Sequence, residues 1–211
     1  MNDLLRYTFE DKYFLIWDLE TECLNLKFNL PWQISWQLNK GYKVLEKHNY
    51  YIKWPLGKLN VSKGAIFVTG FDPQIVEREG RDPKEILDLF DSYLYNKDYN
   101  SVGSNLINFD CMVHAAYREI FSKKVDYSWM ERLYDCNCLI KSLIMNIVKP
   151  KDMDNLTYMF KLNSIIRKGM KTNVGASCKL LDIPFNEEKR HDAFYDIFLS
   201  FEIFKKLIQK V

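Results

Sequence analysis

The sequence predicts an α/β fold: a mixed five-stranded sheet, made of a three-strand meander plus two further strands, flanked by α-helices. Three observations support this fold class. A short apolar run near residue 13 is followed by two strand-like runs with a turn between them. Strand-like and helix-like segments then alternate, and a long amphipathic segment closes the chain. This order is typical of a mixed sheet covered by helices.

The meander begins with Tyr13–Trp17, whose sequence YFLIW is wholly apolar and favours β-structure. Such a run predicts a central strand that is buried on both faces. The next two predicted strands are Gln33–Leu38 and Val44–Lys53, with the turn signal Asn39-Lys40-Gly41 between them. We therefore expect three consecutive strands, of which the first is the most buried.

Helices and single strands alternate through the middle of the chain. Asp82 is a predicted N-cap and Pro83 takes the first helical position, so we expect a helix that runs to about Asn96. Ser101–Gly103 predicts a fourth strand, and the helix after it covers about Phe109–Phe121.

The last third of the chain contains one more strand and three helices. Leu133–Asp135 predicts the fifth strand, which leads into a helix at Leu139–Val148. Lys149–Thr172 is basic, and we expect it to be irregular. A short helix is predicted at Val174–Leu181, and the final amphipathic helix covers about Asp192–Gln209.

Composition limits the classes of protein to which the chain can belong. With 47% hydrophobic and 27% charged residues, the chain can build a core, and we expect a single domain over residues 1–211 with its core at about 13–208. The net charge of +2 neither requires nor excludes a polyanionic partner. The five cysteines form no CxxC pair, which favours buried thiols in a reducing compartment.

The sequence also predicts where the protein works. No apolar run reaches the roughly 18 residues of a membrane-spanning helix, and Met1–Arg6 does not begin a signal peptide. Abundant Lys, Asn and Ile are typical of an AT-rich coding sequence. We therefore expect a cytoplasmic protein without a membrane partner, in a bacterium or, for a viral protein, in the host cell.

Asp18 and Glu20 come directly after the predicted buried strand, two residues apart. Side chains at this spacing on extended backbone project from the same face, with Cα atoms about 7 Å apart. Two carboxylates so placed can share one hard divalent cation. The alternative is a solvated strand end, because an Asp-x-Glu pair arises easily by chance in a chain with this many acidic residues.

Three further residues with suitable chemistry lie at predicted helix starts. Asp110 falls in the first turn of a helix, where a carboxylate also stabilises the helix N-terminus by about 0.5 kcal/mol. His191 and Asp196 are five residues apart, about 140° on an ideal helix, so both can face one site only if His191 lies on the preceding loop. Asp192 as the N-cap would place it there.

Together these residues give the chain a resemblance to the DEDDh (DnaQ-like) 3′→5′ exonucleases of the ribonuclease H-like superfamily. Three motifs carry the resemblance: FLIWDLET with Asp18, Glu20 and Thr21, VGSNLINFD with Asn105 and Asp110, and HDAFYD with His191 and Asp196. Tyr134-Asp135 adds support, since it looks like the strand-end Asp that the family has between the second and third motifs. The resemblance spans about residues 13–208.

The resemblance implies a ribonuclease H-like fold and a two-metal phosphodiesterase that uses Mg²⁺ or Mn²⁺. Carried over by position, Asp18, Glu20 and Asp196 would hold one cation. Asp18 and Asp110 would help to hold the second. His191 would act as general base on the attacking water.

The implied reaction removes nucleoside 5′-monophosphates from the 3′ end of single-stranded DNA or RNA, with DNA favoured. Leu19, Thr21 and Asn105 would contact this substrate. Two alternatives stay open. One is an RNA-directed enzyme similar to oligoribonuclease, and the other is a nucleic-acid-binding, proofreading-type subunit that works with a polymerase or another replication or repair protein.

Two positions depart from the family pattern. Glu22-Cys23 stands where the family often has Thr-Gly, and Glu22 would add negative charge where the strand end meets substrate. Ser104 stands where a His is frequent before the Asn. Neither change touches an expected metal ligand, so both bear on substrate preference.

Further contacts with nucleic acid have candidates outside the motifs. Lys149–Thr172 is the best candidate for contacts with backbone phosphates, although a solvated basic segment explains its composition equally well. Trp32, Trp54 and Tyr158 are candidates for stacking on unpaired bases, a contact worth roughly 1–3 kcal/mol for each base.

Overall fold

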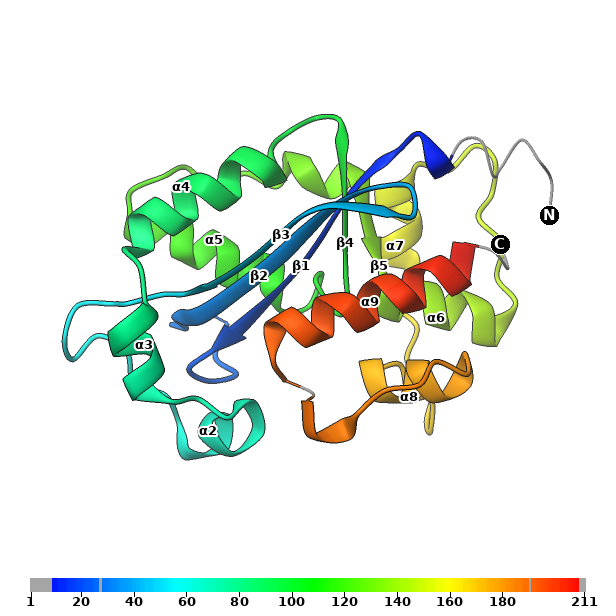
Figure 1. The fold of residues 1–211 in the computed structure, drawn as a ribbon. Helices are drawn as coiled ribbons and strands as arrows, with labels where there is room; N and C mark the ends of the chain where they lie inside the picture. Colours follow the sequence, from blue (N-terminus) through cyan, green and yellow to red (C-terminus); the bar gives the residue numbers. More distant parts are fainter. Residues whose placement is uncertain (1–8, 27, 190, 209–211) are drawn as a thin grey trace.

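The computed structural model describes residues 9–26, 28–189 and 191–208, so the expectations for Met1–Arg6 and Gln209 lie outside the described residues. Its strands are β1 Tyr13–Thr21, β2 Pro31–Lys40, β3 Lys43–Tyr51, β4 Tyr99–Gly103 and β5 Leu133–Asp135. They form a five-stranded sheet in the order β3-β2-β1-β4-β5 (Figure 1). β1, β2 and β3 pair antiparallel, whereas β1, β4 and β5 run parallel. The predicted mixed sheet is therefore confirmed.

β1 is longer than the sequence predicts, and the added residues carry both of its carboxylates. Its apolar first half is buried on both faces, as expected. Parallel pairing with β4 ends at Ile16, but antiparallel pairing with β2 continues to Thr21. The prediction that the strand ends at Trp17 is wrong, because β2 supports the backbone of Asp18 and Glu20 as well. Beyond Ile16 the edge of β1 that faces β4 is open.

The other strands lie where the sequence predicts them, with ends that differ by at most two residues. The turn between β2 and β3 depends on Gly41, whose φ is 53°. A Cβ at this position would lie 2.8 Å from the Cα of Glu10, so both the backbone conformation and the close approach favour glycine.

The helices that the sequence predicts are α4 Pro83–Leu94, α5 Asp110–Ile120, α6 Cys136–Met145, α8 Val174–Leu180 and α9 Ala193–Ile208. Asp82 caps α4 by accepting a hydrogen bond from the amide of Glu85, as expected. α6 begins three residues earlier than predicted because Asp135 caps it, and it ends where Asn146 adopts a left-handed conformation. Among the described residues, no helix is both long and apolar enough to cross a bilayer.

Three helices have no counterpart in the prediction: α2 Lys63–Thr69, α3 Pro73–Glu79 and α7 Asn155–Asn163; two 3₁₀ turns cover Ser128–Arg132 and Glu187–Lys189. α7 corrects the prediction that Lys149–Thr172 is irregular. Asp154 caps this helix, and Tyr158, Met159 and Leu162 are buried along one side of it. This i, i+1, i+4 spacing was the available signal for a helix within the basic segment.

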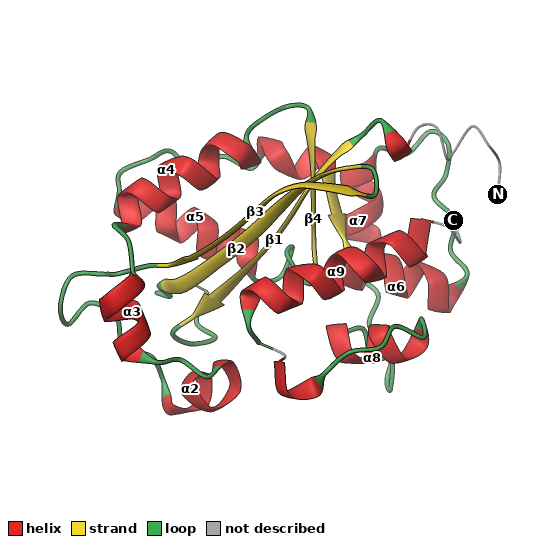
Figure 2. Ribbon diagram, viewed as in Figure 1, coloured by secondary structure: helices red, strands yellow, loops and turns green. Residues whose placement is uncertain are grey.

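Helices cover both faces of the sheet, with α4 and α5 on one side and α9 on the other (Figure 2). Alternate side chains of β1 belong to these two layers. Trp17 packs against Phe90 of α4, with 5.1 Å between ring centroids, and Phe14 packs against Phe204 of α9 at 5.2 Å. The two acidic residues of β1 share the parity of Phe14, so their side chains are directed to the layer that contains α9.

A buried charged cluster joins α4 to α5. Asp91 lies 2.9 Å from Nε2 of His114, accepts from Nζ of Lys123 at 2.7 Å and pairs with Arg118. Burial raises the pKa of Asp91, but the hydrogen bonds from His114 and Lys123 outweigh it and leave that pKa below its ordinary value. Burial lowers the pKa of His114, against the effect of Asp91. The folded state therefore favours an ionised Asp91 and a neutral His114.

We expect the free energy of unfolding to fall as the pH is lowered. The stabilisation that neutral His114 gives the folded state is fully present above the unfolded-state pKa of about 6.5, and it is lost as the pH falls through the lower folded-state pKa. The stabilisation that ionised Asp91 gives is lost as the pH falls below about 3.9. His114→Gln keeps an amide near the Nε2 position but does not titrate. Urea unfolding at stepped pH should therefore show a shallower decline for this variant below about pH 6.5. An unchanged decline would contradict the assignment.

Candidate active site

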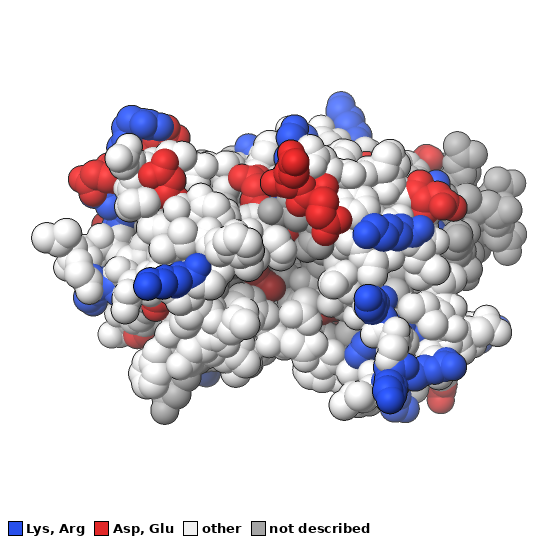
Figure 3. All heavy atoms as spheres, turned by 90° about the horizontal axis from the view of Figure 1, so that it is seen from below, with Lys and Arg blue, Asp and Glu red and all other residues white. Residues whose placement is uncertain are grey.

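A pocket of about 680 Å³ lies where the carboxyl ends of β1 and β4 approach the start of α9. It is lined by all eight residues that the sequence analysis names as site candidates: Asp18, Leu19, Glu20, Thr21, Asn105, Asp110, His191 and Asp196. Figure 3 views this face of the molecule, with acidic atoms visible inside a central hollow and basic side chains gathered to one side of it. Three segments that are distant in sequence thus meet in one cavity.

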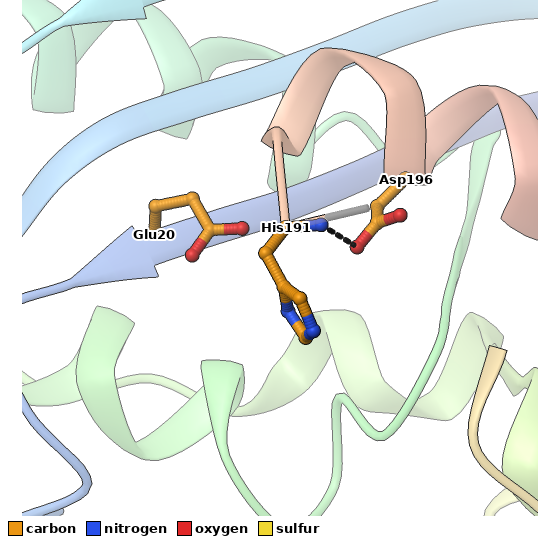
Figure 4. A group of neighbouring side chains, drawn as sticks. All are labelled: Glu20, His191 and Asp196. Carbon is orange, nitrogen blue, oxygen red and sulfur yellow. Dashed lines mark hydrogen bonds between the residues drawn. The ribbon is translucent and has the colours of Figure 1, made fainter. Parts of the chain in front are cut away.

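Glu20, His191 and Asp196 form a compact group within the pocket. One potential ligand atom from each lies within 4.8 Å of those of the other two (Figure 4). Glu20 belongs to β1 and Asp196 to the first turn of α9, and both are buried. Asp18 and Asp110 line the same pocket but lie outside this group of three.

His191 lies on the loop before α9, the position from which it can share a site with Asp196. The loop turns into the helix at Asp192, whose Oδ1 accepts from the amide of Tyr195 at 2.9 Å. The φ of His191 is 65°, a conformation that residues with a Cβ rarely adopt. Its backbone N–H donates to Oδ2 of Asp196 at 3.2 Å (Figure 4). Asp196 therefore lines the pocket and also orients the loop that carries His191.

Asp110 is the first residue of α5 and is almost fully buried. Its Oδ1 accepts from the amide of Leu19 at 3.2 Å, on the edge of β1 that β4 leaves open. Burial raises the pKa of Asp110 to about 8, although hydrogen bonds from backbone amides oppose the rise, and the charge of Asp135 adds to it. A carboxylate in this environment needs a nearby cation to remain ionised near neutral pH.

Asp135 holds the loop between β4 and α5 in place. Its carboxylate accepts from the amides of Asn105 and Ile107 at 3.1 Å each, and from the amide of Asn137 at 2.9 Å. The φ of Asn105 is 66°, so one of these bonds stabilises a strained residue at the wall of the pocket. Asp135 is fully buried and positions pocket residues instead of lining the pocket itself.

The two departures from the family pattern have different structural roles. Glu22 does not face the pocket, contrary to expectation, because its carboxylate accepts from the amides of Leu30 at 3.2 Å and Asn60 at 2.8 Å. It therefore joins the loop between β1 and β2 to the loop that precedes α2. Ser104 does line the pocket, and its hydroxyl lies 2.9 Å from that of Ser200 on α9.

Trp32, Trp54 and Tyr158 are not available for stacking on bases. All three are buried in the core, with at most 7% of their surface exposed. The indole N–H of Trp54 donates to the carbonyl of Pro31 at 2.7 Å, and the hydroxyl of Tyr158 donates to the carbonyl of Ile147 at 2.8 Å. The sequence could not distinguish these core residues from exposed aromatic residues.

The pocket has further walls that the sequence analysis missed. Ala65, Val68 and Thr69 of helix α2 line one side. Another side is lined by Asn137 of α6 and by Asn173, the N-cap of α8. α2 contains no buried residue and begins at the N-cap Ser62, ending at Gly70 with φ 67°. A Ser before the segment and a Gly after it were the signals by which the sequence could have revealed this helix.

The donor set of the pocket fits hard divalent cations. Four carboxylates and one imidazole line it, and its described lining residues include no Lys or Arg to balance their charge. Mg²⁺ and Mn²⁺ prefer carboxylate oxygens. The residues that could hold such ions are Asp18, Glu20, Asp110 and Asp196, with His191 within reach of one of them. Because clustered carboxylates repel one another, cation binding would also stabilise the site.

Solved structures with a similar fold include exonuclease I of E. coli. Its zinc-bound complex with single-stranded DNA matches with a TM-score of 0.73 at 17% sequence identity, over 94% of this chain and 41% of that one. Its complex with a dT13 oligonucleotide gives 0.71 at 18% identity, over 94% and 41%. Apo exonuclease I gives 0.73 at 18%, over 95% and 42%. The chain thus spans about two-fifths of the length of these proteins.

No protein-family model matches the chain, and no curated protein matches it in sequence. At this level of identity the structural likeness establishes the fold alone. The mixed five-stranded sheet with flanking helices is the ribonuclease H-like fold of exonuclease I, as the motif resemblance implies.

We expect Asp110→Asn to raise the melting temperature of the metal-free protein. The substitution removes a buried negative charge but keeps an oxygen that can accept from Leu19, and each kcal/mol gained is worth about 2–4 °C in a chain of this size. Differential scanning calorimetry in EDTA at pH 8 measures the effect, with the exposed Asp152→Asn as a matched control that should change little.

Excess Mg²⁺ should reduce or reverse this difference, because cations that bind the folded protein stabilise the wild type more than the variant. A variant that melts below the wild type in EDTA would mean that the carboxylate is structural.

Proposed function

We propose that the chain is a metal-dependent 3′→5′ exonuclease that releases nucleoside 5′-monophosphates from single-stranded DNA. The observation that carries this proposal is the convergence of four carboxylates and His191 in one pocket, from segments that are far apart in sequence. Such a cluster has an unfavourable electrostatic energy in the absence of cations. Its chemistry is that of phosphodiester hydrolysis assisted by two metal ions.

The structural comparison supports the choice of substrate. Exonuclease I has a similar fold, and its solved structures include complexes with single-stranded DNA and with a dT13 oligonucleotide. No observation favours an RNA substrate or a polymerase partner over this choice. The proposal for this chain is therefore restricted to single-stranded DNA ends, and it agrees with the expected location in the cytoplasm.

The four acidic residues would divide the work of holding two Mg²⁺ or Mn²⁺ ions. We assign Asp18, Glu20 and Asp196 to one ion and Asp18 with Asp110 to the other. When bound, the ions would stabilise negative charge on the attacking and leaving oxygens of the phosphate. Asp110 and Asp196 are held in place by their hydrogen bonds to backbone amides, so two of the four ligands are already oriented before a cation binds.

His191 would act as the general base. It would take a proton from the water that attacks the terminal phosphorus, while the bond between phosphorus and the 3′ oxygen of the preceding nucleotide breaks. The leaving 3′ oxygen takes a proton from solvent, which leaves the preceding nucleotide with a 3′ hydroxyl, and the terminal nucleotide leaves as a 5′-monophosphate. The loop position of His191, next to Glu20 and Asp196, supports this role.

Leu19, Thr21 and Asn105 would contact the terminal nucleotide. All three line the pocket beside the carboxylates. Thr21 has its hydroxyl fixed by hydrogen bonds with Cys23 and Asn29, and Asn105 is fixed through Asp135. The nucleotide would therefore meet a surface that is largely formed before it binds.

The first test of the function removes the metal. With a 5′-labelled single-stranded DNA, EDTA should abolish shortening from the 3′ end, and excess Mg²⁺ or Mn²⁺ should restore it. A strand with a blocked 3′ end is the matched control and should remain intact. Full cleavage in excess chelator would contradict the proposal, as would shortening of the blocked strand.

The second test addresses His191. His191→Ala should leave DNA binding unchanged but lower kcat by about 10²–10⁴-fold, since general base catalysis typically contributes this much. An imidazole accepts a proton only when neutral, so the wild-type rate should rise with pH as the base loses its proton, and the variant should lose this rise. His48→Ala, in β3 and outside the pocket, should behave like wild type. A variant with most of its activity and an unchanged pH profile would exclude the role.

A further inference from the structure

Three basic residues on the segment between α7 and α8 have no counter-charge in the described part of the protein. Arg167, Lys168 and Lys171 are exposed, and none forms an ion pair with a described residue. Elsewhere on the surface, lysines such as Lys53 and Lys84 pair with a neighbouring carboxylate. The basic segment therefore carries a local positive charge that no ion pair with a described residue balances.

The same segment leads directly into the wall of the pocket. Thr172, Asn173 and Val174 line the cavity, and Lys171 immediately precedes them. Lys168 is four residues from Thr172, so their Cα atoms are at most about 14 Å apart. In Figure 3, the basic side chains that gather beside the central hollow lie on the side of α8. A ligand that leaves the pocket on this side would reach them at once.

A strip of neutral polar side chains connects the acidic end of the pocket to the basic segment. Asn105, Asn137, Thr172 and Asn173 all line the cavity. Asn105 and Asn137 follow the carboxyl ends of β4 and β5, and Thr172 and Asn173 directly precede α8. The amide oxygen of Asn137 has no hydrogen-bond partner among the described residues. Neutral amides and hydroxyls can contact sugars and phosphates without the repulsion that the carboxylates exert on an anion.

The opposite wall has a different character. Leu24, Ala65 and Val68 give it apolar surface, Ser62 and Thr69 add two hydroxyl groups, and the exposed Lys63 stands between the lining residues Ser62 and Gly64. For a polyanionic strand with its terminal phosphate among the carboxylates, the side of α8 therefore offers neutral polar lining residues together with three closely spaced basic residues, a denser combination than the described residues of the α2 wall provide.

We infer that the strand upstream of the 3′ end leaves the pocket across Asn137 and Thr172, and that Arg167, Lys168 and Lys171 bind its backbone phosphates. This inference rests on the proposed function and adds the path and polarity of the single strand on the surface. Of the two explanations for the basic composition of this segment, phosphate binding and a solvated surface, the inference selects phosphate binding. The contacts are to phosphate, so they would be independent of base sequence.

The test compares two triple variants. One is Arg167→Gln, Lys168→Gln and Lys171→Gln. The matched control is Lys12→Gln, Lys43→Gln and Lys97→Gln, three exposed lysines at the opposite end of the sheet, beside the amino ends of β1 and β4 and the β2–β3 turn. KM and kcat are measured on single-stranded dT oligonucleotides of 20 and 3 nucleotides, over a series of NaCl concentrations with Mg²⁺ present.

In the basic-segment variant, KM for the longer strand should be about tenfold higher at 0.1 M salt, and kcat should be unchanged. The slope of log KM against log salt should fall by about 2, because each of the three lost phosphate contacts to a single strand contributes about 0.7. The shorter strand, which has only two internucleotide phosphates, should be affected less. The control variant should resemble wild type on both strands. Equal KM values and equal salt slopes for the two triple variants would overturn the inference, even when the wild type is an active exonuclease.

Binding of the labelled 20-nucleotide strand, measured by fluorescence anisotropy in EDTA, separates this inference from the proposed function. If the wild type binds the strand and the basic-segment variant binds it about tenfold more weakly, the inference stands, whether or not any hydrolysis occurs with Mg²⁺. If the wild type hydrolyses the strand and both triple variants bind it equally well, the proposed exonuclease function is supported and the inferred path of the strand is contradicted.

Discussion

Hydrogen bonds from backbone amides to buried carboxylates hold the pocket together. Asp110 accepts from β1, Asp135 accepts from the loop after β4, and Asp196 accepts from the loop before α9. The first two bonds join segments that are distant in sequence, and the third fixes the loop before α9 to the first turn of that helix. Burial of a carboxylate is unfavourable, and these amides offset only part of that cost, as the raised pKa values of Asp110 and Asp135 indicate. The arrangement is therefore one that a bound cation would stabilise further.

The sheet determines where this pocket can open. β1 has an antiparallel neighbour on one side and a parallel neighbour on the other, and β4 ends first. The carboxyl end of β1 is thus supported by β2 while its other edge is free, which gives Asp110 access to the amide of Leu19. Ligand sites in α/β sheets form at such points, where neighbouring strands leave in different directions. α9 then closes the pocket from the face to which Glu20 is directed.

The distribution of charge follows from this geometry. The carboxylates are concentrated at the end of β1, where each raises the electrostatic cost of the others, and the uncompensated basic residues lie beyond α6 at the entrance to α8. A net charge near neutral conceals this separation, because the two groups nearly cancel in the sum. Two strained residues, Asn105 and His191, line the pocket, and the backbone of each is held by a carboxylate. Strain of this kind persists where surrounding contacts fix the backbone.

The sequence by itself determined the mixed sheet, the buried strand, the cap at Asp82 and the shared face of Asp18 and Glu20, because periodicity and capping act within a few residues. Tertiary structure decided the rest. Whether Glu22 met substrate or a loop, and whether Trp54 stacked on a base or filled the core, depended on segments distant in sequence. The convergence of four carboxylates with His191 also required the pairing of β1 with β4 and the packing of α9, since no local signal encodes which chain segments meet across a sheet.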